Sequence, residues 1–444
     1  MAAVQGGKQP QWISAEEAAA LVQPGDWLDY GTSFNQPDTV DRALAARGHE
    51  LSGVGIRNCL TVRPRAVLEQ EPEGRAFHVF NWHFSGYDRR WHDAGRVTYT
   101  PCNLGEIPHY YRRNIERVDI AILKAAPPDA DGYLCLGPNS LWHGAVLERA
   151  KRIVIEVSGQ VPTAFGTDNR IHLSQVDALV RGEDGPTPEL PSAPVADVDR
   201  AVAAQIAERI EDGACLQIGI GGMPNAVCAL LMEAGIKDLG IHTEMMNDGL
   251  AALYRAGLIK GSAKAVEPGK ITYTFALGTR ALYETVADNP DFLCLPVDTT
   301  NDPAVIARND RVVAINNTTQ IDLQGQAASE SDGHRHISGT GGQLQFVRGA
   351  YASAGGKSFI CLASTYERKG IRKSRIVLDH TPGNIITTPR SDMMYVVTEF
   401  GCVNLKGMSV AERARALIGL AHPDFREELS RAAREKGLVP RFYL

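Results

Sequence analysis

The pattern that most constrains the fold is a strand, a glycine-rich turn, a helix and a second strand in close succession. Residues 214–220 (ACLQIGI) are apolar enough for a buried strand, and residues 225–234 (NAVCALLMEA) have helical spacing of apolar side chains with Gly235 as a stop. A short strand is predicted at residues 238–241, followed by the lone carboxylate of Glu244. Because ligands bind beyond the carboxyl ends of strands in a parallel α/β sheet, the glycine turn and Glu244 are predicted to share one edge.

Helix-like and strand-like segments also alternate on both sides of a proline-rich stretch. Residues 181–199 hold four prolines and five acidic residues, a composition typical of a linker. The sequence therefore predicts an α/β protein with two tandem, similar, open lobes of mostly parallel sheet and a cleft between them. The N-terminal lobe is expected at residues 1–185, the linker at 186–199, and the C-terminal lobe with Glu244 at 200–444.

The two predicted lobes share a local pattern. Residues 25–31 and 213–219 each bracket a strand with glycines, and each is followed by a turn that ends in a proline, Pro37 or Pro224. Two explanations stay open: any two strand-and-helix units resemble each other, or the lobes arose by internal duplication.

Composition excludes several classes of protein. The formal net charge of −6 argues against a general nucleic-acid binder, and no apolar run reaches the about 18 residues of a membrane span. The N-terminal segment has no basic-then-apolar signal pattern. The eight cysteines are scattered singly with no CxxC pair, which favours reduced core residues and a cytoplasmic location.

Two further segments favour a ligand cleft. Glycines at 339–342 and 355–356 precede a predicted buried strand, and the backbone amides of Gly341 and Gly342 could stabilise an oxyanion on a thioester or anhydride carbonyl. Residues 366–375 (YERKGIRKSR) hold five cations. This basic stretch is either a solvated loop or a site for a phosphate-bearing ligand.

Other catalytic motifs are missing or weak. The turn at 219–222 is GxGG without the full GxGxxG spacing, so a dehydrogenase is disfavoured, although a glycine turn can also serve only tight packing. Neither a nucleoside-triphosphate P-loop nor a G-x-S-x-G elbow occurs. His334 and His336 have no third ligand at metal-site spacing, and no metal is expected. His242 is interpreted as a packed or orienting residue.

Seven segments make the chain resemble a known enzyme family over nearly its whole length. They are GIGGMPNAV (219–227), HTEMMNDG (242–249), INNTTQIDLQGQ (315–326), SESDGHRHISGTGGQLQFVRGA (329–350), GGKSFICLAST (355–365), VVTEFGCVNLKG (396–407) and AERARALIGLAHPDFRE (411–427). These segments resemble the acetyl-CoA hydrolase/transferase family, the class I CoA-transferases. The stretch FNWHFSGYDRRW (80–91) is similar to the butyryl-CoA:acetate and 4-hydroxybutyrate transferase branch.

The resemblance implies roles for individual residues. Glu244 matches the glutamate that forms a covalent thioester with CoA. The residues that match family contacts to CoA are Gly219, Gly221, Gly222, Met223, Pro224, Asn225, Asn316, Gly342 and Lys369. In the first lobe, Phe34 and Gln36 depart from the plainer glycine turn of relatives, and they are expected to line the acyl pocket.

The resemblance also implies the reaction and its partners. CoA would pass between a short-chain acyl-CoA and a free carboxylate such as acetate, with CoA as a substrate and no separate cofactor. A homodimer or dimer-based assembly is expected. Two alternatives stay open: an acyl-CoA hydrolase that uses the same intermediate, and a non-catalytic CoA-binding protein, which the presence of Glu244 disfavours.

Overall fold

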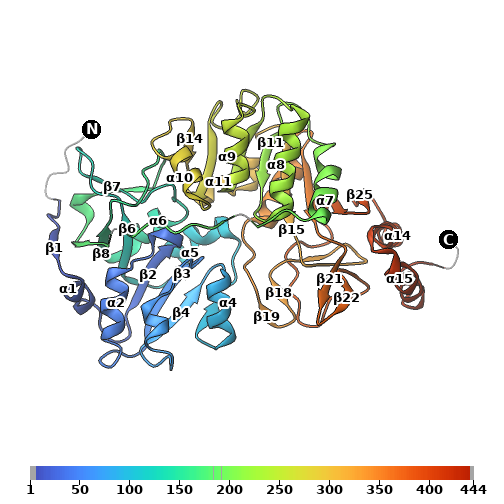
Figure 1. Ribbon diagram of the computed structural model, residues 1–444. Coiled ribbons are helices and arrows are strands. Elements are labelled where there is room, and N and C mark those ends of the chain that lie inside the picture. Colours follow the sequence, from blue (N-terminus) through green and yellow to red (C-terminus); the bar gives the residue numbers. More distant parts are fainter. Residues whose placement is uncertain (1–6, 184, 192, 441–444) are drawn as a thin grey trace. The chain divides into compact units, whose positions relative to one another are not determined.

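A computed structural model describes residues 7–183, 185–191 and 193–440 of the chain (Figure 1). The described chain forms two compact units. The first contains residues up to 190 together with 273–300 and 337–339, and the second contains 191–272, 301–336 and 340 onwards. The division therefore differs from a single cut along the sequence, because residues 273–300 group with the first unit although they follow the linker by more than seventy residues.

The first unit is built on an eight-stranded sheet. Its strands in chain order are β1 (Gln11–Ile13), β2 (Trp27–Thr32), β3 (Val54–Cys59), β4 (Phe77–Asn81), β5 (Val97–Tyr99), β6 (Val118–Ala125), β8 (Ala150–Val157) and β10 (Ala178–Arg181). Their order across the sheet is β1-β10-β8-β6-β2-β3-β4-β5, and every neighbouring pair is parallel. All eight residues of β6 are buried, as expected for a strand covered on both faces.

Helices and short strands complete the first unit. The helices are α1 (Ala15–Ala20), α2 (Thr39–Ala46), α3 (Ala66–Glu69), α4 (Gly86–Asp93), α5 (Ile107–Arg113), α6 (His143–Arg149), α10 (Arg280–Val286) and α11 (Val297–Thr300). The short strands are β7 (Tyr133–Cys135), β9 (Arg170–His172) and β14 (Phe292–Cys294), and most of β13 (Ile271–Ala276) belongs here as well. Ser14 and Ser85 begin α1 and α4 with capping boxes, which satisfies amides that a helix start leaves unpaired.

The second unit has a similar plan. Its main strands are β12 (Gly240–Met246), β11 (Cys215–Ile218), β15 (Val312–Asn317), β20 (Lys357–Cys361), β24 (Tyr395–Thr398) and β25 (Gly401–Asn404), given in their order across the sheet. The pairs are parallel except for β24 with β25, which is antiparallel. The α/β fold class with mostly parallel sheets is therefore confirmed.

The helices of the second unit connect and cover these strands. They are α7 (Asp197–Ala207), α8 (Gly222–Ala234), α9 (Asp248–Arg255), α12 (Pro303–Ile306), α13 (Gln343–Ala352), α14 (Val410–Leu420) and α15 (Pro423–Glu435). Helix α7 starts inside the range predicted as linker. Short strands form small sheets and hairpins: β16 (Gln320–Asp322), β17 (Ala327–Ala328), β18 (Ser331–Asp332), β19 (Arg335–His336), β21 (Thr365–Arg368), β22 (Ile371–Ser374) and β23 (Ile376–Val377).

The strand that precedes the proline-containing turn has the same surroundings in both units. In the first, β2 lies between β6 and β3; in the second, β11 lies between β15 and β12. In each case the next strand along the chain lies on one side and a later strand lies on the other. This arrangement is the point at which an open sheet reverses its winding, where α/β proteins place ligands.

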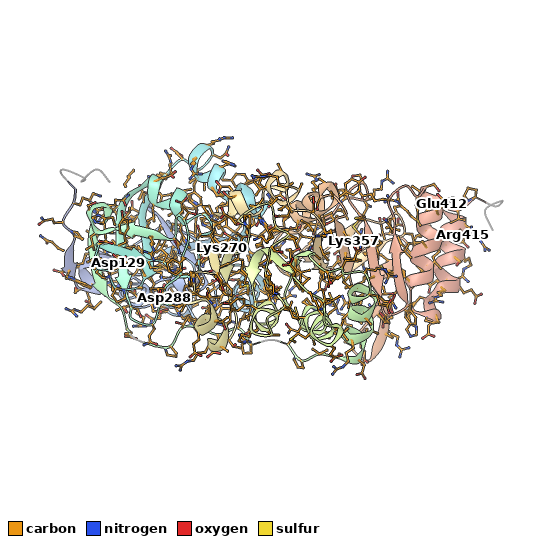
Figure 2. All side chains as sticks on the ribbon, turned by 90° about the horizontal axis from the view of Figure 1, so that it is seen from above. Asp129, Lys270, Asp288, Lys357, Glu412 and Arg415 are labelled. Atoms are coloured by element: carbon orange, nitrogen blue, oxygen red, sulfur yellow. The ribbon has the colours of Figure 1, made fainter. Side chains whose placement is uncertain are left out.

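The charged residues Asp129, Asp288, Glu412 and Arg415, which are labelled in Figure 2, are exposed. No described helix is long and apolar enough to cross a membrane.

Candidate active site

Glu244 lies within strand β12 of the second unit, two residues before its end. The expectation of a strand limited to 238–241 was too short. His242, Thr243 and Glu244 are polar, so the sequence does not identify them as part of a buried strand. His242 and Thr243 are nevertheless buried, because parallel strands are covered on both faces. Leu216 of β11 pairs with Ile241, so Gly219 stands level with Glu244 at the carboxyl edge of the sheet.

Two groups from distant parts of the chain hold the Glu244 carboxylate. Nδ2 of Asn301 donates a hydrogen bond to Oε2 of Glu244 at 2.5 Å. The backbone amide of Gly342 forms a second hydrogen bond to the carboxylate. No described side chain donates to Oε1, so one carboxylate oxygen is held and the other is free of side-chain donors.

The environment makes this carboxylate unusually basic. Burial raises the pKa of Glu244 from 4.5 to about 7, and the hydrogen bonds from Asn301 and Gly342 oppose that rise only in part. The residue as a whole keeps some exposure, so a ligand can still reach it. A carboxylate with a pKa near 7 is ionised in a large fraction at neutral pH and is a better nucleophile than an ordinary one.

Gly342 must be a glycine for this contact to exist. It is the N-cap residue directly before helix α13, and a Cβ there would overlap both Oε2 of Glu244 and Nδ2 of Asn301. Gly341 before it has a φ of 59°, in the left-handed region that favours glycine. Of the two predicted backbone donors, Gly342 provides an amide that reaches Glu244, and a role for the Gly341 amide stays a prediction.

A buried layer beneath Glu244 fixes the strand and the helix against each other. His242 lies on the same face of β12 as Glu244, and its ring centroid is 6.3 Å from that of Phe346, one turn into α13. Nδ1 of His242 lies 3.2 Å from Oγ1 of Thr272, which accepts a hydrogen bond from the buried Nζ of Lys264 at 3.0 Å. His242 therefore packs beneath the site rather than facing a substrate.

The predicted CoA-binding turn lies directly beyond β11. The amide of Gly219 donates to Ile315, and its carbonyl accepts from Nδ2 of Asn247 at 3.0 Å. Gly221 has a φ of 124°, which a side chain would disfavour. A Cβ on Gly222 would lie 2.8 Å from the carbonyl of Pro194, so this glycine also serves tight packing.

The turn opens onto a pocket of about 290 Å³ within the second unit. The pocket is lined by Val198, Asp199, Val202, Gly222, Met223, Asn317, Thr318, Thr319, Cys361, Leu362, Ala363 and Arg375. Of the predicted CoA-binding turn, Gly222 and Met223 thus face a space that can hold a ligand, and Pro224 and Asn225 continue into the first turn of α8.

Asn316 and Lys369, the two outlying CoA-binding predictions, have different surroundings. Asn316 exchanges hydrogen bonds with the side chain of Gln217, at 3.1 and 3.3 Å, on the neighbouring strand. Lys369 is exposed at the turn of the β21–β22 hairpin. The structure places neither side chain against Glu244, and their roles stay predictions.

Phe34 and Gln36 are interior residues of the first unit. Phe34 is only 1% exposed, and its ring meets that of Tyr283 edge-on at 5.9 Å. Gln36 is fully buried and its Nε2 donates to the carbonyl of Cys59 at 2.9 Å. The turn that lines a pocket in the second unit is therefore filled by its own side chains in the first, and a role in acyl selection stays a prediction.

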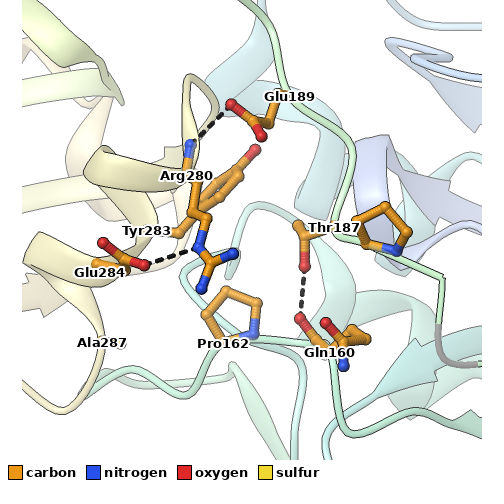
Figure 3. A pocket seen from close by; sticks show the side chains of 9 residues that line it. Gln160, Pro162, Thr187, Glu189, Arg280, Tyr283, Glu284 and Ala287 are labelled. Atoms are coloured by element: carbon orange, nitrogen blue, oxygen red, sulfur yellow. Dashed lines mark hydrogen bonds and ion pairs between the residues drawn. The ribbon is translucent and has the colours of Figure 1, made fainter.

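A second pocket, of about 270 Å³, lies in the first unit (Figure 3). The guanidinium of Arg280 in its wall pairs with Glu284 at 2.7 Å, while the carboxylate of Glu189 accepts the Arg280 amide at 2.9 Å. The hydroxyl of Tyr283 donates to the carbonyl of Pro188 at 2.9 Å. The charges of this pocket are thus already paired within the protein.

Asn301 is the site residue that the sequence did not reveal. It is fully buried and follows α11 in the segment VDTTND (297–302), which has no glycine cluster to mark it. Only its position in space, beside a carboxylate 57 residues earlier in the chain, identifies it.

Comparison with known proteins identifies the family of the chain. The N-terminal domain model of the acetyl-CoA hydrolase/transferase family matches residues 7–191, and the C-terminal domain model matches residues 278–433. The butyryl-CoA:acetate CoA-transferase of Anaerostipes caccae is 42% identical over 96% of this chain and 96% of its own. The 4-hydroxybutyrate coenzyme A transferase of Clostridium kluyveri is 37% identical over 94% and 96%.

A solved structure gives the same result. The crystal structure of RipA from Yersinia pestis superposes with a TM-score of 0.89 at 36% identity, covering 97% of this chain and 98% of that one. With both domain models and relatives matched along nearly the full length, the chain belongs to the acetyl-CoA hydrolase/transferase family, as an enzyme of its CoA-transferase type.

Proposed function

We propose that this enzyme transfers CoA between a short-chain acyl-CoA and a free carboxylate such as acetate, through covalent intermediates on Glu244. The observation that carries the proposal is the arrangement of the Glu244 carboxylate. Its Oε2 is held by Asn301, the Gly342 amide also bonds the carboxylate, and no described side chain donates to Oε1. The named transferase relatives support a carboxylate rather than water as the acceptor.

The first half of the reaction loads CoA onto the enzyme. Oε1 of Glu244 attacks the thioester carbonyl, the C–S bond breaks, and an acyl-glutamyl anhydride and CoA thiolate form. The thiolate then attacks Cδ of Glu244, the bond between Oε1 and Cδ breaks, and the acid leaves as a carboxylate. The product is a glutamyl-CoA thioester, so one difficult exchange becomes two easier ones.

The second half reverses these steps with a new acid. The incoming carboxylate attacks Cδ of the glutamyl thioester and expels the thiolate, which then attacks the acyl carbonyl of the new anhydride and frees Glu244. CoA is a substrate throughout, and the steps balance without a metal or redox cofactor. A homodimer or dimer-based assembly remains part of this proposal.

The resting contacts of Glu244 suit its two own tetrahedral intermediates. When the thiolate or the carboxylate attacks Cδ, negative charge develops on the glutamyl oxygen that does not leave. Oε2 is that oxygen, and Nδ2 of Asn301 already donates to it, with the Gly342 amide alongside. Donors placed before charge develops need no rearrangement, and one such donor is worth roughly 10²–10³ in rate.

The experiment traps the intermediate and measures the acceptor. A short-chain acyl-CoA such as butyryl-CoA should turn over only when acetate is present, and its CoA should appear as acetyl-CoA without release of free CoA. Borohydride or hydroxylamine should inactivate the enzyme only after acyl-CoA has been added, with the modification on the peptide that contains Glu244. The control is Glu330→Ala, a second buried glutamate of the same unit, which should still be trapped at Glu244.

Two results separate the proposal from its alternatives. Equal CoA release with and without acetate would make the protein a hydrolase. A Glu244→Ala protein that still transfers CoA at a near-normal rate would end the covalent mechanism. If wild-type enzyme binds CoA but neither transfers it to acetate, nor releases it by hydrolysis, nor is trapped, the protein is a non-catalytic CoA binder.

A further inference from the structure

The five cations of the basic stretch differ in their surroundings, and one of them is turned inward. Arg372 pairs with Asp424 at 3.0 Å and Arg368 with Asp332 at 3.6 Å, both at the surface. Arg375, by contrast, is half-buried and lines the pocket of the second unit. Arg375 therefore differs from the other four cations in its burial against the pocket and not in its charge.

Arg375 is held in place without being neutralised. Its Nη1 donates to the carbonyl of Thr319 at 3.0 Å, and its guanidinium lies 4.9 Å from the ring centre of Tyr366. Burial lowers the pKa of the guanidinium. Among the residues that the structure describes, no carboxylate lies within 4 Å of it. A half-buried cation without an acid partner is costly unless a ligand supplies the negative charge.

The other pocket shows what a neutralised arginine looks like in this protein. In the first unit, the guanidinium of Arg280 pairs with Glu284, and the backbone amide of Arg280 donates to the carboxylate of Glu189 (Figure 3). Arg280 therefore has an acidic partner within its own chain, which Arg375 lacks among the described residues. Arg375 keeps most of its guanidinium donors available to a ligand.

The pocket lies where the sheet of the second unit reverses its winding. Gly222 and Met223 follow β11, Thr318 and Thr319 follow β15, and Leu362 follows β20. Val198, Val202 and Met223 make much of its wall apolar, while Arg375 and Asp199 add one charge of each sign. Such a pocket fits an elongated ligand with an apolar or amide-bearing arm and one anionic end.

The pocket is also at a suitable distance from the reacting carboxylate. Register places Glu244 level with Gly219 on β11 and with Asn316 on β15. Strands β15 and β20 are two and three positions from β12, which corresponds to about 10–14 Å between Glu244 and the far pocket wall. The extended pantetheine arm of CoA can span such a separation with its thiol at Glu244.

We propose that Arg375 binds a phosphate group of the acyl-CoA substrate, and that the pocket between β11 and β20 holds the part of the substrate next to that phosphate. The inference rests on the proposed function and adds the residue that recognises the anionic end. Asp199, which also lines this pocket, would accept a hydrogen bond from a hydroxyl or amide of the ligand rather than meet the phosphate.

The test compares ligands with and without phosphates on one variant. Isothermal titration would measure binding of CoA, dephospho-CoA, 4′-phosphopantetheine and pantetheine to wild-type enzyme and to Arg375→Gln, which keeps a donor for the Thr319 carbonyl. CoA should bind the variant about 10- to 100-fold more weakly, the usual loss for a charge-assisted hydrogen bond, whereas pantetheine should bind both proteins equally. Lys373→Gln, which removes an exposed cation two residues away, is the matched control, and Lys369→Gln tests the hairpin turn.

The ligand series also identifies the phosphate. If Arg375→Gln loses affinity for CoA but not for dephospho-CoA, Arg375 binds the 3′-phosphate. If the variant loses equal affinity for CoA, dephospho-CoA and 4′-phosphopantetheine, Arg375 binds the pyrophosphate. The inference is overturned if Arg375→Gln binds CoA as tightly as wild type does, or if the variant loses as much affinity for pantetheine as for CoA. It is also overturned if Lys373→Gln weakens CoA binding as much as Arg375→Gln does. Wild-type enzyme that binds no CoA would instead remove the proposed function itself.

Discussion

Gly342 lies so close to Glu244 that the carboxylate occupies the space a side chain would need. The same backbone amide that begins helix α13 forms a hydrogen bond to this carboxylate. The start of helix α13 and the reactive side chain of Glu244 are thus held in direct contact, and this contact has measurable consequences.

Gly342→Ala should abolish most of the transfer activity. The added Cβ would displace Oε2 of Glu244 and Nδ2 of Asn301, and a displacement of about 1 Å can cost roughly 10²-fold in rate. Steady-state transfer from butyryl-CoA to acetate measures the loss. Gly419→Ala in helix α14 is the control, because a Cβ there meets nothing within 4 Å. Near-normal activity of Gly342→Ala would show that the close contact is not needed.

Enzyme loading should depend on pH with a midpoint near 7. The nucleophile is the ionised form, and burial raises the pKa of Glu244 to about 7. Below that pH, kcat/KM for acyl-CoA should fall about tenfold per unit of pH, because the free enzyme is protonated. Single-turnover release of the free acid from acyl-CoA between pH 5 and 9 gives the profile. A flat profile down to pH 5 would mean that the carboxylate is not perturbed.

Glu244→Gln should stabilise the protein at high pH. The pKa of Glu244 rises from 4.5 to about 7 on folding, so its contribution to stability is present below pH 4.5 and is lost as pH rises through 7. The full loss in the free energy of unfolding corresponds to about 3 kcal/mol. Glutamine cannot ionise, and its Oε1 can still accept a hydrogen bond from Asn301. Thermal unfolding at pH 5.5 and 8 should show a gain that grows with pH. An equal gain at both values would refute the linkage.

Phe346→Leu should raise the pKa of Glu244 further. Phe346 packs on His242 one turn after Gly342, so a smaller side chain lets the start of α13 move away from the carboxylate. Loss of the Gly342 hydrogen bond removes an effect that lowers this pKa. The same pH profile measures the shift. Phe359→Leu, another buried phenylalanine of this unit, stacked on Tyr395 at 4.9 Å, should destabilise the fold without moving the midpoint.

Phe34→Leu tests the expected acyl pocket. If Phe34 shapes that pocket, the variant should change the preference among acetyl-, butyryl- and hexanoyl-CoA, by roughly 1–3 kcal/mol per methylene-sized difference. Phe77→Leu, a buried phenylalanine in the core of the first unit, is the control and should leave the preference order unchanged. An unchanged order in both variants would leave Phe34 as a core residue that packs on Tyr283.

Local features of the fold and the site were readable from the sequence, and long-range ones were not. The apolar run at 214–220 and the glycine turn after it became β11 and the start of α8, because burial and backbone freedom leave a local mark. Glu244 was identified as the one carboxylate beside that turn, together with its family motif. The C-terminal end of β12 was misplaced because a strand covered on both faces can carry polar side chains.

The partners of Glu244 could be predicted only in part. Gly342 belonged to a visible glycine cluster, but Asn301 lies in a segment with no distinguishing composition. An acyl-pocket role for Phe34 and Gln36 stays a prediction, but their burial could not be predicted, because it depends on neighbours distant in sequence, such as Tyr283 and Cys59. Periodicity carries no information about such contacts.

The assignment of residues 273–300 to the first unit has a consequence for biosynthesis. The chain leaves the ribosome from its N-terminus, and domains usually fold as they emerge. Here 300 of the 444 residues must be made before helices α10 and α11 can join the unit that began at the N-terminus. Strands β11 and β12 are already synthesised by then. The first unit is therefore still incomplete, and open to aggregation, when the second has begun to form.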